Sequence, residues 1–163
     1  MNMLEKPADT TAAKIRNAAM DLLTGREFSR AELATKLNKR FDNHPSTDEV
    51  LAKLSEEGLQ SDKRFAEAFV RSRLHRGHGL ARIRQDIRPK GVSDELVARA
   101  LEEADIDWYE LARDVATRKF GQRPAADQRE KAKRMRFMQY RGFNYDQIKY
   151  ALGAAADADE YFD

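Results

Sequence analysis

The chain contains no cysteine. This absence excludes disulfide bonds, thiolate metal sites and a cysteine nucleophile, and it suits a reducing compartment. Aromatic residues make up only 9% of the 163 residues, against 36% charged residues, so a single large core is not expected. No apolar run approaches the roughly 18 residues that a membrane helix needs, and residues 1–11 lack the apolar stretch of a signal peptide. We therefore expect a cytoplasmic protein that does not contact the membrane.

Motifs for catalysis and cofactor binding are also scarce. The run Gly77–Gly79 is followed by Arg82 where a dinucleotide fingerprint needs glycine, and no Gly-Lys-Ser/Thr phosphate loop occurs. His75 and His78 have no further ligands at a zinc spacing. The acids within 102–107 diverge around a helix instead of facing each other. These absences favour a binding protein over an enzyme, with no catalytic residue, cofactor or metal.

What the chain does have is an internal repeat at a constant shift of 51 positions. The stretches 82–92 and 133–143 both run from an apolar helix pattern into a glycine turn, at Gly91 and Gly142. The same shift aligns three further apolar pairs: Val92 with Phe143, Val97 with Ile148, and Leu101 with Leu152. A helical unit that recurs at fixed period predicts an array in which each unit packs mainly on its neighbours.

Apolar residues follow helical spacing along the whole chain, and no alternating run is long enough for a sheet. We predict an all-α fold of three tandem three-helix repeats that form an elongated, curved array. The predicted segments are a flexible N-terminal tail at 1–11, repeats at 12–59, 60–105 and 106–153, and an acidic C-terminal tail at 154–163. The predicted core of the middle repeat consists of Phe69, Ile83, Ile87, Val97 and Leu101.

Several helix ends have recognisable signals. Ser29 and Glu32 have the spacing of a capping box, which predicts a helix start. Ser46 or Thr47 is expected to cap a further helix. Pro89 and Gly91 predict the end of the helix that contains Ile83 and Ile87, because proline lacks an N–H group and glycine accepts a left-handed backbone.

The formal net charge of +2 hides a strong segregation of charge. Residues 63–93 hold nine Lys/Arg against two Asp/Glu, residues 94–117 hold two against eight, and residues 118–149 hold ten against three. A single charged block is explained as well by ordinary solvation of helix faces. Two basic blocks at equivalent places in two repeats favour two basic patches with an acidic one between them.

The first predicted patch comprises Arg73, Arg76, Arg84 and Arg88, and the second comprises Lys133, Arg136 and Arg141. Since these bases flank apolar positions on their helices, we expect them to be exposed and available. Arginine suits bidentate contact with carboxylate or phosphate, and the sequence does not decide between these anions. The predicted partner-binding residues are Arg71, Arg73, Arg76, Arg82, Arg84, Arg88, Lys90, Lys131, Lys133, Arg136 and Arg141. Tyr140 and Tyr145 are the only rings that we expect at the surface.

Three stretches of the chain resemble the RecX family, regulators of the RecA recombinase. They are Ser-Asp-Lys-Arg-Phe-Ala at 61–66, Gly-Leu-Ala-Arg-Ile-Arg at 79–84 with Lys-Gly-Val at 90–92, and Arg-Gly-Phe at 141–143. The resemblance extends from about Ala18 to Leu152, and Pro89 departs from the family pattern. It implies a non-enzymatic protein that binds the RecA–DNA filament and suppresses its strand exchange, ATP hydrolysis and coprotease activity. We expect a monomer, with single- or double-stranded DNA as a second candidate ligand of the basic patches.

Two other functions stay open at this point. Residues 28–58 alone have the pattern of a helix-turn-helix transcription regulator, which predicts sequence-specific DNA binding. Against it, no β-wing pattern follows Leu59, and the motif recurs twice in the chain. The third candidate is a structural adaptor that uses the acidic surface at 94–110. An ATPase assay of a recombinase filament separates the first function from the other two.

Overall fold

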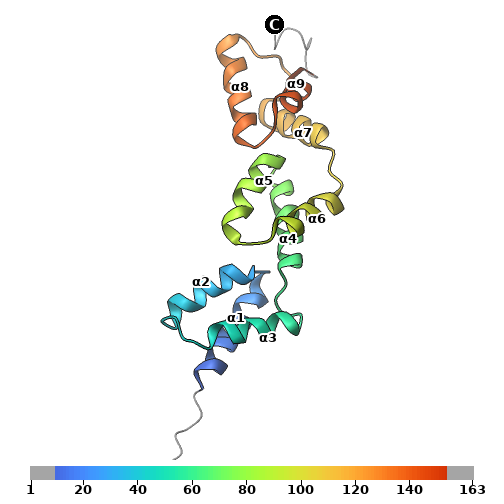
Figure 1. The fold of residues 1–163 in the computed structure, drawn as a ribbon. Coiled ribbons are helices and arrows are strands. Elements are labelled where there is room, and N and C mark those ends of the chain that lie inside the picture. Colours follow the sequence, from blue (N-terminus) through green and yellow to red (C-terminus); the bar gives the residue numbers. More distant parts are fainter. Residues whose placement is uncertain (1–9, 154–163) are drawn as a thin grey trace, which may run out of the picture.

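The computed structural model describes residues 10–153, and this part of the chain is all helical, with no strand. Figure 1 shows the helices gathered in three groups that are stacked along an elongated array, which confirms the predicted all-α repeat fold. The groups are α1 (Thr11–Gly25), α2 (Arg30–Arg40) and α3 (Thr47–Glu56); α4 (Asp62–His75), α5 (Leu80–Ile87) and α6 (Asp94–Ala104); α7 (Trp108–Phe120), α8 (Gln128–Tyr140) and α9 (Tyr145–Gly153).

Residues 1–9 and 154–163 of the predicted tails lie outside the described residues, while Thr10 is the N-cap residue of α1 and Thr11 begins that helix. The exact boundaries between the repeats stay a prediction. Within residues 10–153, no helix has the length and apolar character needed to cross a membrane.

Side chains that accept hydrogen bonds define most helix starts. At α2 the capping box is formed, because Ser29 Oγ accepts from Glu32 N at 3.1 Å and the Glu32 carboxylate accepts from Ser29 N at 3.1 Å. Ser61, Ser93, Asp107 and Asp127 accept in the same way at α4, α6, α7 and α8. At α3, Ser46 occupies the cap position, which is one of the two predicted positions, but its hydroxyl makes no capping hydrogen bond.

The end of α5 follows the predicted signals. The helix passes after Ile87 into a single 3-10 turn, η1 (Arg88–Lys90), which contains Pro89. Gly91 then takes a left-handed backbone with φ of 74°. A residue with a Cβ is strained in this region, so glycine lets the chain reverse into α6.

Three separate clusters of buried apolar side chains form the core, one for each group of helices. In the middle cluster, Ile83, Ile87 and Val97 are buried as predicted, while Phe69 and Leu101 are half-buried and pack against it. Trp108 begins α7 but also packs against the middle cluster. The third group of helices is therefore tied to the second by apolar contact as well as by the chain.

The contacts between repeats follow one scheme at both junctions. The turn between the second and third helices of one repeat packs on the start of the second helix of the preceding repeat. At the junction between the second and third repeats (the upper junction), Gly79 N donates to the Arg141 carbonyl at 2.7 Å, and Ala81 N donates to the Gly142 carbonyl at 3.3 Å. At the junction between the first and second repeats (the lower junction), Ser29 Oγ donates to the Lys90 carbonyl at 2.7 Å. These hydrogen bonds fix the order and spacing of the units, and hence the spacing of the charged helices.

Candidate partner-binding surface

The second helix of each repeat carries a large excess of positive charge. Residues 30–40 and 80–90 each hold four Lys/Arg against one Asp/Glu, and residues 128–140 hold five against one. Figure 1 shows the helices in these ranges, α2, α5 and α8, on the same side of the array. Positive charge therefore recurs on one side of the molecule at each level of the stack.

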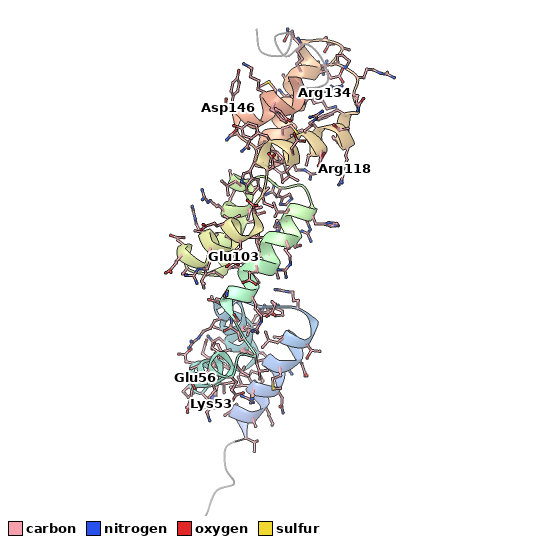
Figure 2. All side chains as sticks on the ribbon, turned by 90° about the vertical axis from the view of Figure 1, so that its right-hand side faces the viewer. Lys53, Glu56, Glu103, Arg118, Arg134 and Asp146 are labelled. Atoms are coloured by element: carbon pink, nitrogen blue, oxygen red, sulfur yellow. The ribbon has the colours of Figure 1, made fainter. Side chains whose placement is uncertain are left out.

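The opposite side carries acids on the third helices. Helix α3 holds three acids against one base, α6 holds four against one, and α9 holds one of each. Figure 2 shows Glu56, Glu103 and Asp146, which come from these three helices, one above another along the array. The array thus has a basic side along its length and an acidic excess on the third helices of the first two repeats, α3 and α6.

Six of the eleven predicted partner-binding residues are exposed: Arg71, Arg76, Arg84, Arg88, Lys133 and Arg136. Arg84 and Arg88 stand one helical turn apart beside the buried Ile87. Within residues 10–153 their side chains make no hydrogen bond and no ion pair. Their guanidinium groups are therefore available to an anionic partner.

Four other predicted residues are not freely available, which corrects the expectation that all of these bases are exposed. Arg73 Nη1 and Arg82 Nε both donate to Asp86 Oδ2, at 2.9 and 3.0 Å. Their side chains are 21% and 23% exposed. The hydrogen bond to Asp86 also raises the pKa of Arg82 above its usual value. Asp86 therefore holds two of the predicted binding residues as part of the fold.

Lys90 and Arg141 form the junctions themselves. Lys90 Nζ lies 3.2 Å from Glu32 Oε2, across the lower junction. Arg141 Nη1 donates to the Arg76 carbonyl at 2.6 Å, across the upper junction. Because Arg141 belongs to the second predicted patch and Arg76 to the first, the two patches meet here, with no acidic segment between them. Lys131, the remaining predicted residue, is half-buried and also interacts within the chain.

Glu32 is the acidic centre of the lower junction. Partial burial raises the pKa of its carboxyl, but hydrogen bonds from Arg26, the Ser29 N–H and Lys90 outweigh burial and leave that pKa below its ordinary value. The carboxylate is therefore ionised at neutral pH. It holds Arg26 and Lys90, so neither of these cations serves as a free binding residue.

A buried histidine lies near the upper junction. Burial and the neighbouring Arg82, Arg73 and Arg141 lower the pKa of His78, and Asp86 only partly opposes them. Its Nδ1 atom is buried and has no hydrogen-bond partner within residues 10–153. The imidazole is therefore neutral at neutral pH. Among the same residues, no group of three or more His, Asp or Glu side chains could hold a metal ion.

Sequence reasoning missed two features of the surface. Lys36, Lys39 and Arg40 extend the basic side onto α2, and all three are exposed. The expectation that only Tyr140 and Tyr145 are surface rings is wrong, since Tyr109 and Tyr150 are 43% and 37% exposed. Their rings lie 5.6 Å apart in a T-shaped contact. The run of bases at 36–40 is visible in the sequence and could have indicated that α2 belongs to the basic side. The contact between Tyr109 and Tyr150 could not be found in this way, because the two rings lie on different helices.

Two family models match the chain. The model described as "RecX, second three-helix domain" matches residues 61–101, and the model described as "RecX, third three-helix domain" matches residues 105–152. These ranges contain α4–α6 and α7–α9 almost entirely. The matched segments are the two in which the sequence repeat is clearest.

Relatives named "Regulatory protein RecX" match most of the chain. The one from Halorhodospira halophila is 44% identical and covers 94% of this chain and 95% of its own length. The one from Chromohalobacter salexigens is 43% identical, with coverage of 90% and 95%. A crystal structure of RecX from Lactobacillus salivarius is 24% identical and superimposes with a TM-score of 0.71 over 88% of this chain and 96% of that chain. This last similarity supports the fold alone.

Proposed function

The chain belongs to the RecX family of regulatory proteins, and from this premise we propose that it binds the RecA–DNA filament and inhibits its activities. The inhibited activities are strand exchange, ATP hydrolysis and coprotease action. The observation that carries the proposal is the row of exposed bases on successive second helices, among which Arg84 and Arg88 have no counter-ion within residues 10–153. A protein filament around DNA offers regularly spaced negative charge from carboxylates and phosphates, which such a row can meet.

The geometry of the array suits a filament more than an isolated protein. Each repeat presents its second helix on the same side, so one molecule offers several binding elements at a fixed spacing. Contacts that are individually moderate combine when one rigid body carries them all. Lying in the filament groove, the protein would touch more than one protomer, restrain their relative movement and obstruct incoming DNA or a repressor substrate.

Neither of the other two functions is favoured by a specific observation. A winged helix-turn-helix regulator needs a β-wing after α3, but within the described residues α3 is followed by Gln60, which is buried, and then by α4. Leu33 and Leu37 of the supposed motif are both buried in the first core cluster.

The test is an ATPase assay of a recombinase filament on single-stranded DNA, with this protein added in increasing amounts. We expect inhibition at substoichiometric ratios to RecA, because one bound molecule restrains several protomers. Strand exchange should fall in parallel. Filaments that hydrolyse ATP at an unchanged rate, while the protein binds a specific duplex sequence, would instead support a transcription regulator. We place the protein in the cytoplasm, where such a filament forms, and expect it to act as a monomer.

A further inference from the structure

A shallow groove runs beside the free arginine pair, between α5, η1 and α6. Its volume is about 330 Å³, its apolar floor is formed by Ile87, Val92 and Val97, and the exposed Ala98 lies at its edge. This volume is at the low end of the roughly 300–1,000 Å³ that is typical of small-ligand sites. The groove therefore has room for one or two side chains of a partner, and its floor suits apolar ones.

The rim of the groove is charged. Arg84 and Arg88 line one edge, and within the described part of the chain neither has an anionic partner. Asp94 lines the same groove from the first turn of α6, where the partial positive charge of the helix N-terminus stabilises its carboxylate. The rim therefore carries two cations and one anion, and the N-terminus of α6 already stabilises that anion. The remaining positive charge attracts a negative ligand.

The combination of an apolar floor and paired arginines distinguishes a protein ligand from DNA. A phosphate backbone would satisfy the two arginines but would leave the apolar floor covered by sugar or water. A peptide segment can place an aliphatic or aromatic side chain on the floor while its carboxylates meet the guanidinium groups in bidentate fashion. Charge and apolar surface are then both complemented by the same ligand.

We propose that this groove binds an acidic segment of the recombinase protein, through one apolar side chain flanked by carboxylates, and does not bind DNA. The assignment rests on the proposed filament binding and names the ligand of one part of the basic side. Phosphate contacts, where they occur, then belong to other bases such as Lys133 and Arg136, which are exposed on α8.

One variant pair separates apolar insertion from charge. Ala98 is exposed on α6, so Ala98→Gln fills the groove with a neutral polar side chain and leaves the fold and net charge unchanged. The matched control is Ala13→Gln, at an exposed position of α1 in the first repeat. We expect Ala98→Gln to weaken binding to a RecA filament on oligodeoxythymidylate by roughly tenfold, and Ala13→Gln to change it less than about twofold. Binding of both variants to free oligodeoxythymidylate should equal that of the wild type.

A second variant tests the rim. Arg84→Gln/Arg88→Gln should weaken filament binding by at least about tenfold and should change the affinity for free oligodeoxythymidylate by less than about twofold. If it weakens binding to free DNA as much as binding to the filament, while Ala98→Gln has no effect, the groove is a DNA contact and the assignment is wrong. A wild-type protein that does not bind the filament would refute the proposed function itself. Filament binding that survives both variants would refute only the groove.

Cross-linking identifies the ligand directly. Because the chain has no cysteine, Ala98→Cys provides a unique thiol for a short photo-activated cross-linker at the edge of the groove. In the assembled complex we expect cross-links to a RecA peptide that contains Asp or Glu next to an apolar residue. Cross-links to the oligonucleotide, or to RecA peptides without acids, would overturn the assignment.

Discussion

Gly142 lies directly against Arg82, so close that a Cβ atom placed on Gly142 would come within 2.4 Å of the Arg82 Cβ and 2.5 Å of its backbone nitrogen. One of these residues is in the α8–α9 turn, and the other is in the first turn of α5 in the preceding repeat. Gly91 stands in the same relation to Ala31, with 2.7 Å between such a Cβ and the Ala31 Cβ. The repeated glycine is therefore required for two reasons: the backbone of the turn has a positive φ, and the packing of one repeat on another leaves no room for a Cβ atom.

Gly142→Ala should destabilise the protein strongly. Gly142 has φ of 99°, and alanine there both adopts a strained backbone and collides with the backbone of Arg82. We expect a loss of roughly 3 kcal/mol or more in the free energy of unfolding, measured by urea denaturation. Gly58→Ala is the matched control, since Gly58 has φ of 76° and open space around it. The control should cost only the backbone strain, about 1–2 kcal/mol, and equal losses would show that the junction is not tightly packed.

Ile87→Ala tests the core of the middle repeat. Ile87 is 3% exposed and belongs to the middle cluster, so its truncation leaves a cavity. We expect a loss of about 2–5 kcal/mol in the free energy of unfolding. Leu59→Ala removes similar apolar volume from a residue that is 41% exposed, and it should cost less than about 1 kcal/mol. Because repeats stabilise their neighbours, the Ile87 variant should unfold in one transition at a lower temperature.

The parts of the fold that depend on local spacing were predictable from the sequence. Ile83 and Ile87 lie one helical turn apart and are buried, and Ser29 forms its capping box with Glu32. These features depend on residues within a few positions of each other. The family also followed from short motifs at fixed spacing.

The availability of individual bases was not predictable in the same way. Arg73 and Arg84 look equivalent in the sequence, yet Asp86 binds Arg73 and Arg82 and leaves Arg84 free among the described residues. Helical spacing places Arg82 one turn before Asp86 and turns Arg84 away from it. Whether Arg73 reaches the same carboxylate depends on how α4 packs against α5, and the spacing along one helix carries no information about this. Likewise, Arg141 meets the Arg76 carbonyl from 65 positions away. Charge blocks therefore indicated the basic side but not which of its members are free.

The pH dependence of stability should report the environment of His78. Burial and the three nearby arginines lower the pKa of its imidazole below the ordinary 6.5. The unfolded chain therefore binds a proton near pH 6.5 that the folded protein takes up only at lower pH. It follows that the free energy of unfolding should decrease as the pH falls below about 6.5, until the lowered pKa is reached.

Urea midpoints of the wild type should show this decrease, and those of His78→Gln should be flatter between pH 7 and pH 5. His75→Gln, at an exposed position of α4, should leave the wild-type profile unchanged.

The shape of the molecule in solution gives an independent check on the array. A compact chain of this length has a radius of gyration of roughly 15 Å. Three stacked units with separate cores should give a clearly larger value by small-angle X-ray scattering, together with the mass of a single chain. A compact value would contradict the stacked arrangement, and a doubled mass would contradict the expected monomer.

Charge reversal at two arginine pairs should separate binding from folding. Arg84 and Arg88 are exposed and form no ion pair in the described part of the chain, so Arg84→Glu/Arg88→Glu should leave the helical circular dichroism and the unfolding midpoint close to those of the wild type. The same change replaces attraction by repulsion towards an acidic partner, and inhibition of the recombinase ATPase should require at least about tenfold more protein.

Arg73→Glu/Arg82→Glu should behave in the opposite way. Both guanidinium groups donate to Asp86, and the reversal places three carboxylates together at a half-buried site beside the upper junction. We expect this variant to lose stability by roughly 2–4 kcal/mol, so that weaker inhibition follows from unfolding. If the Arg84/Arg88 variant is fully folded and inhibits at wild-type concentration, the basic side of α5 does not bind the filament. The acidic surface at 94–110 then becomes the surface to test, because residues 94–117 hold eight acids against two bases.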